Sequence, residues 1–138
     1  MKRMLMHLFN RREMNKNMTA LQNLGSTERH LAANDLALTN ELIRNSHQRH
    51  LQFFLHDATR SRQASMTNGA NGRNFGSWLV PAVNETLLQC ALVDGRGSKE
   101  FATGVTQVDG FVRANTSQSE RDAAIQKARN ILADLDRV

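Results

Sequence analysis

The chain has 138 residues, 40% of them hydrophobic and 22% charged, so it is long enough for one buried core but too short for two independent ones. Its single cysteine, Cys90, excludes an intrachain disulfide and a zinc site built from several cysteines. The formal net charge of +5 is unevenly placed, because residues 1–16 and residues 44–73 each hold five basic residues and one acidic residue. This pattern excludes a uniformly basic domain and predicts two local basic surfaces.

Residues 1–25 are expected to form a basic N-terminal arm that contains a short helix over about residues 3–23, ended by Gly25. The arm starts with basic residues and a short apolar run, as a secretory signal does. However, the run contains His7 and leads into Arg11 and Arg12 instead of a small-residue cleavage site, so we do not expect export by a signal peptide. No apolar stretch approaches the roughly 20 residues of a membrane span. We therefore expect the protein in the cytoplasm of a bacterial host or in a virion.

A single long helix is predicted over residues 26–63. Ser26 is the expected N-cap, and neither Gly nor Pro follows until Gly69. Such a helix would be about 55 Å long at 1.5 Å per residue, which is more than a domain of this size needs. We expect it to project or to pack against neighbouring chains. Residues 64–77 are rich in Gly and Asn, which favour turns, and are predicted to be a loop.

Residues 78–114 are predicted to form a small antiparallel β-meander. Short apolar and β-branched runs alternate there with turn signals at residues 94–97 and at residues 109–110. Leu88, Cys90 and Leu92 would share one strand face, and Phe101, Thr103 and Val105 another, although residues 84–91 also fit a turn of helix.

The last predicted element is an amphipathic helix over residues 118–136, which begins with a capping box formed by Ser117 and Glu120. Together these elements predict an α+β fold in which residues 26–138 form a single domain.

Two faces are predicted for the central part of the long helix. Ile43, His47, His50, Leu51, Phe54 and Ala58 would face the core, and Arg49, Phe53, His56 and Arg60 would face a partner. The pair His47 and His50 has the spacing of two metal ligands, but no further ligand accompanies it, so packing is the preferred interpretation. We expect no catalytic, metal-binding or cofactor-binding residues. The candidate partner-binding or nucleic-acid-binding residues are Lys2, Arg3, Arg11, Arg12, Arg49, Phe53, His56, Arg60, Arg62 and Arg73.

The leading functional hypothesis is a non-enzymatic structural or assembly subunit of a larger particle, such as a phage virion, that binds other protein subunits through the long helix and the arm and forms oligomers. An alternative is a nucleic-acid-binding accessory or regulatory protein, because arginines beside an exposed phenylalanine suit phosphates and bases. A third hypothesis is a small enzyme or toxin with a site of His and Arg residues. The arm could also contact an anionic membrane surface through its apolar and basic residues.

Overall fold

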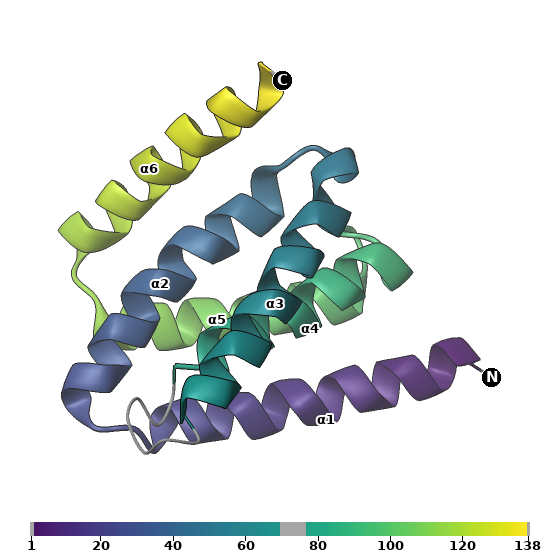
Figure 1. Cartoon of the computed structure of the whole chain (residues 1–138), viewed down its shortest axis with the longest axis horizontal. Helices are drawn as coiled ribbons and strands as arrows, with labels where there is room; N and C mark the ends of the chain where they lie inside the picture. The colour runs from purple at the N-terminus through teal and green to yellow at the C-terminus, as the bar shows by residue number, and fades with distance from the viewer. Residues whose placement is uncertain (1, 70–76, 138) are drawn as a thin grey trace.

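Every regular element that the structure describes is helical. The computed structural model of the chain describes residues 2–69 and 77–137, and side chains within residues 9–67 and 77–137. The elements are α1 (Lys2–Gln22), α2 (Ser26–Asn45), the short 3-10 helix η1 (Gln48–His50), α3 (Leu51–Gly69), α4 (Leu79–Asp94), α5 (Lys99–Asn115) and α6 (Gln118–Asp136) (Figure 1). The predicted α+β fold is therefore wrong: no strand occurs in residues 2–69 or 77–137, and residues 78–114 form two helices instead of a meander.

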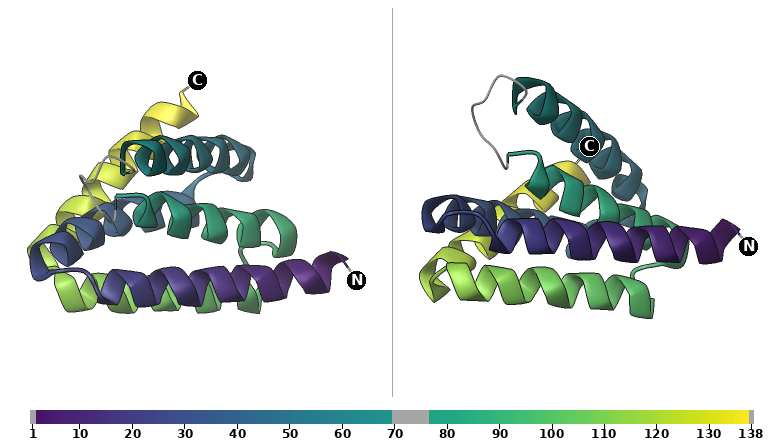
Figure 2. Two further views of the ribbon diagram at one scale, coloured as in Figure 1. Left: turned by 60° about the horizontal axis from the view of Figure 1, so that its bottom comes forward. Right: turned by 90° about the horizontal axis from the view of Figure 1, so that it is seen from below.

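Helix α4 lies at the centre of the bundle and packs against α1, α2, α3 and α5. Figure 2 shows α3 on one side of α4, with α1 and α5 on the other side. Helix α6 packs on α2, away from α4. The buried residues Met14, Met18 and Leu21 of α1 join the common core, so this part of the expected arm packs against the rest of the fold.

Residues 79–94 of the predicted meander form helix α4, which is buried on most of its sides. Ten of its sixteen residues are buried, and they include the polar Asn84 and Thr86, so its polar residues do not mark one exposed face. Its apolar residues therefore show no period that distinguishes a helix from a buried strand. Pro81 lies in the first turn, where a missing N–H removes no helical hydrogen bond.

Helix α5 has a clear helical pattern that the turn signal at residues 109–110 obscured. Its buried residues recur every three or four positions and are Phe101, Gly104, Val108, Phe111 and Val112. A Cβ on Gly104 would lie 2.7 Å from Leu87 Cδ2, so this glycine allows α5 to approach α4 closely. The turn predicted at residues 94–97 is confirmed, and Gly95 adopts a φ of 90° there.

The predicted continuous helix over residues 26–63 is also wrong. Helix α2 starts after Gly25, which takes the N-cap position predicted for Ser26, and it ends at Asn45. Ser46 and His47 are extended, with ψ of 158° and 145°. The guanidinium Nη1 of Arg96 donates to the carbonyl oxygens of Ile43, Arg44 and Ser46 at 3.2, 3.2 and 2.6 Å. Because Arg96 lies fifty residues beyond Ser46, local sequence did not reveal this termination.

Two further predictions concern the start of the loop after α3 and the bounds of the last helix. The structure differs from the first and agrees with the second. Helix α3 continues to Gly69, so the loop predicted from residue 64 begins later, and residues 70–76 lie outside the described residues. The predicted helix over residues 118–136 and its capping box are confirmed: Ser117 Oγ accepts from the Glu120 N–H at 3.1 Å, and Glu120 Oε1 accepts from the Ser117 N–H at 2.9 Å.

Arg96→Ala is expected to lower the free energy of unfolding by about 1–3 kcal/mol, because three carbonyl groups at the end of α2 lose a charged donor. Urea denaturation followed by circular dichroism measures the change. Arg129→Ala, at an exposed site on α6, is the control and should change the value by less than about 0.5 kcal/mol. Equal midpoints for the two variants would contradict the capping role.

Glu120 makes the start of α6 sensitive to acid. Its pKa falls to about 2, first because its carboxylate accepts from the backbone N–H of Ser117, and then because it accepts from Asn34 Nδ2. His30 Nε2 of α2 lies 2.9 Å from the same carboxylate. Since the pKa is lowered on folding, this contribution to stability is complete above the ordinary value of 4.5 and is lost as the pH falls toward about 2.

The melting temperature of Glu120→Gln is therefore expected to lie below that of the wild type above pH 5. The gap should close as the pH falls from about 4.5 to about 2, as measured by thermal melts across this range. Asp122→Asn, exposed on the same helix, controls for the loss of a surface charge. Parallel curves for the wild type and Glu120→Gln down to pH 2 would refute the interpretation.

Candidate functional site

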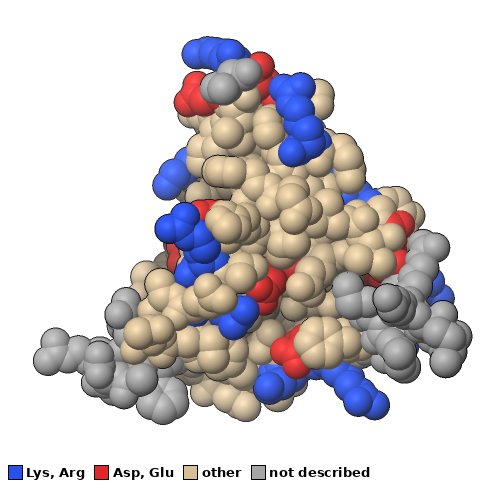
Figure 3. Space-filling model, turned by 45° about the vertical axis from the view of Figure 1, so that its right-hand side comes forward, with Lys and Arg blue, Asp and Glu red and all other residues tan. Residues whose placement is uncertain are grey.

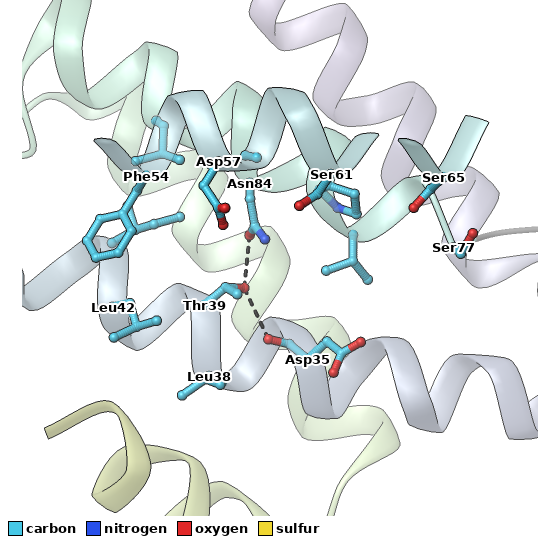
Figure 4. A pocket seen from close by; sticks show the side chains of 15 residues that line it. Asp35, Leu38, Thr39, Leu42, Phe54, Asp57, Ser61, Ser65, Ser77 and Asn84 are labelled. Carbon is cyan, nitrogen blue, oxygen red and sulfur yellow. Dashed lines mark hydrogen bonds between the residues drawn. The ribbon is translucent and has the colours of Figure 1, made fainter. Parts of the chain in front are cut away.

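A groove lies between α2 and α3, with α4 as its floor. The two helices diverge from η1 and both rest on α4 (Figure 1), and the groove between them has a volume of about 360 Å³. It exists because the chain turns at Ser46 instead of continuing as one helix. Figure 4 shows the side chains that line it, which are Asp35, Leu38, Thr39, Leu42, Ile43, Phe54, Asp57, Ala58, Ser61, Ser65, Ser77, Val80, Pro81, Asn84 and Leu88.

The lining of the groove is mainly apolar. Leu38 from α2, Phe54 from α3 and Pro81 from α4 are each half-buried, so part of each side chain remains in contact with solvent. One polar contact joins the wall to the floor: the Thr39 hydroxyl lies 2.9 Å from Asn84 Oδ1 and 3.1 Å from the carbonyl oxygen of Asp35. This arrangement suits an apolar side chain of a ligand.

Two carboxylates stand on the walls of the groove, Asp35 on α2 and Asp57 on α3. Neither forms an ion pair with any residue among those the structure describes. Desolvation raises the pKa of Asp35, and the nearby Lys127 of α6 partly opposes this effect. The groove therefore combines apolar walls with negative charge, which favours a ligand that is both apolar and cationic.

The outer face of α3 carries three of the predicted binding residues. Phe53, His56 and Arg60 are exposed and recur at helical spacing, and Phe53 is 59% exposed. Arg49 is exposed in η1, just before α3. The rings of Phe53 and Phe54 lie edge to face, with centroids 5.7 Å apart. The outer face and the groove are thus adjacent on the same helix.

The other predicted binding residues lie elsewhere. Arg62 turns toward α4, where its Nε donates to Glu85 Oε1 at 2.9 Å, and Thr59 donates to the same carboxylate. Arg62 therefore joins α3 to α4. Arg11 and Arg12 are exposed on α1, whereas the side chains of Lys2 and Arg3, and all of Arg73, lie outside the described residues.

The histidines whose side chains the structure describes do not converge on one point. His47 was predicted to face the core but is exposed, while His50 is half-buried; their ring centroids are 6.2 Å apart. His47 Nε2 lies 3.7 Å from Asp136 Oδ1, and His30 contacts Glu120. Across the described part of the chain, no three His, Cys, Asp or Glu side chains form a group that could hold a metal ion.

Cys90 is buried and is not activated as a nucleophile. Burial, followed by the charges of Asp94 and Glu100, raises its pKa to about 11, so the thiol stays protonated at neutral pH. This agrees with its interpretation as a small buried hydrophobic residue.

One wall of the groove has a signal in the sequence. Asp35, Leu38, Thr39 and Leu42 recur at intervals of three and four residues and form a mixed acidic and apolar stripe on α2. The groove itself could not be foreseen, because it requires the turn at Ser46 and the helical state of α4.

No described helix is both long enough and apolar enough to span a bilayer. Comparisons of the chain with protein-family models, curated proteins and solved structures found no match.

Proposed function

We propose that this protein is a non-enzymatic binding subunit of a larger multi-subunit assembly and that the groove between α2, α3 and α4 is its binding surface. The apolar groove is the observation that carries the proposal. Leu38, Phe54 and Pro81 keep apolar surface in water there, and burying such surface against a partner contributes roughly 25 cal/mol per Å². A virion or a comparable particle remains the type of assembly that we propose.

The chemistry of the groove favours a protein partner. Asp35 and Asp57 would repel phosphate groups but would attract the Lys or Arg side chains of a protein segment. In the face drawn in Figure 3, basic and acidic side chains are interspersed with large uncharged areas, so this face offers no continuous basic track. These features support an assembly role over binding along a nucleic acid.

Photo-crosslinking tests the proposal. A photoreactive amino acid at Leu38, expressed in the full chain in the source organism, should give a protein adduct of defined mass that sediments within a larger particle. The same amino acid at Thr106, which is exposed on α5 away from the groove, is the control. Identical adducts from both positions, or none from Leu38, would refute the groove as the binding surface.

A nucleic-acid-binding accessory role is the second candidate, and the outer face of α3 favours it. An exposed phenylalanine between basic side chains suits base stacking and phosphate contact, and Phe53, His56 and Arg60 share such a face. Arg62, a further candidate binding residue, donates to the Glu85 carboxylate of α4 and lies outside this face.

For this candidate, Arg60→Glu should weaken binding to single-stranded DNA or RNA about tenfold and lower the salt slope by about one, as measured by fluorescence anisotropy at several salt concentrations. Arg129→Glu on α6 is the control and should leave both values nearly unchanged. If the wild-type chain binds neither nucleic acid, or binds without a salt slope, this second candidate is wrong.

A further inference from the structure

One continuous surface carries both an exposed aromatic side chain and an apolar groove. Phe54 lines the groove, and Phe53, its neighbour in the chain, stands 59% exposed on the outer face of α3. Their rings are in contact, so apolar surface extends without interruption from the groove to the outer face. Aromatic residues of this kind are common anchors of protein interfaces.

The charges on this surface are arranged in two adjacent halves of opposite sign. Asp35 and Asp57 lie in the groove, whereas His56 and Arg60 lie on the outer face, with Arg49 in the preceding turn. Arg60 forms no ion pair with any residue in the described ranges. Two adjacent halves of opposite sign are what a two-fold dimer requires, because its axis sets each half against the opposite half of the second copy. A surface with this property is complementary to itself.

We infer that the partner in the groove is a second copy of this chain, in a dimer with two-fold symmetry. The two α3 helices pair antiparallel, so that Phe53 of each copy enters the groove of the other and Arg60 approaches the other copy's Asp57. The inference rests on the proposed function, because it assigns an occupant to the same groove.

Among the described residues, the other large exposed phenylalanine does not offer this arrangement. Phe9 of α1 is 56% exposed and is followed by Arg11 and Arg12. However, α1 packs against α4 and α5 on the side of α4 opposite α3 (Figure 2), so Phe9 is not continuous with the groove. This makes Phe9 a matched control for Phe53.

Light scattering on the purified full chain, run through a sizing column over a range of concentrations at low salt, is the first test. The wild type should be a dimer in equilibrium with monomer. Phe53→Asp should weaken dimerisation by roughly 30-fold, as expected for the loss of a central aromatic anchor. Phe9→Asp introduces the same chemical change at a similarly exposed site and should leave the dimer unchanged.

A charge exchange is the second and sharper test. Asp57→Arg and Arg60→Glu should each weaken the dimer about tenfold, because each variant opposes like charges across the interface. An equimolar mixture should regain wild-type affinity as a heterodimer, because both contacts then join opposite charges. Native mass spectrometry detects the heterodimer, and melting curves show that each variant is folded.

The proposed dimer is refuted if the wild type stays monomeric or if Phe53→Asp leaves the dimer affinity unchanged. It is also refuted if Phe9→Asp dissociates the dimer, or if the equimolar mixture does not regain wild-type affinity. These failures are distinct from failure of the proposed function. An adduct of Leu38 with a different protein would keep the groove as a binding surface and would overturn the second copy as its occupant. An adduct of Leu38 with the chain itself that sediments within a larger particle would support both.

Discussion

The contact between Arg96 and the end of α2 determines where the chain changes direction. Helix termini leave carbonyl groups without partners, and here a single guanidinium from the loop between α4 and α5 satisfies three of them. A cation at the C-terminus of a helix also interacts favourably with the helix dipole. The chain leaves α2 in an extended conformation at Ser46 and His47, and α3 then runs along α4. Without this turn, α2 and α3 would not be two walls above a common floor.

The second constraint is the burial of α4. This helix contacts four others, and α3 is held to it partly by the bidentate pair of Arg62 with Glu85. On the far side, Gly104 lets α5 approach Leu87. The core therefore fixes the floor of the groove from both sides, while the walls remain accessible to solvent. A rigid floor with accessible walls is well suited to binding, because little conformational freedom is lost when a partner arrives.

The sequence predictions were right where the interacting residues lie close together in the chain, and wrong where these residues lie far apart in the chain. The capping box of Ser117 and Glu120 lies within four residues, and the helix that it starts was predicted at its observed position. The turn at Gly95 was equally local. In contrast, α4 has no polar face from which its period could be recognised, and the end of α2 depends on Arg96, which is distant in sequence. The exposed face of Phe53, His56 and Arg60 was predicted from helical period alone, whereas the groove required three helices to be placed in space.

The two carboxylates of the groove are not equivalent, because α6 lies on the outer side of α2. Lys127 of α6 already interacts with Asp35 on the α2 wall, whereas Asp57 on the α3 wall has no ion-pair partner among the described residues. Lys127 therefore offsets part of the attraction that Asp35 would exert on a cation in the groove. Unequal neighbours of this kind favour one direction of a bound cationic segment over the reverse direction.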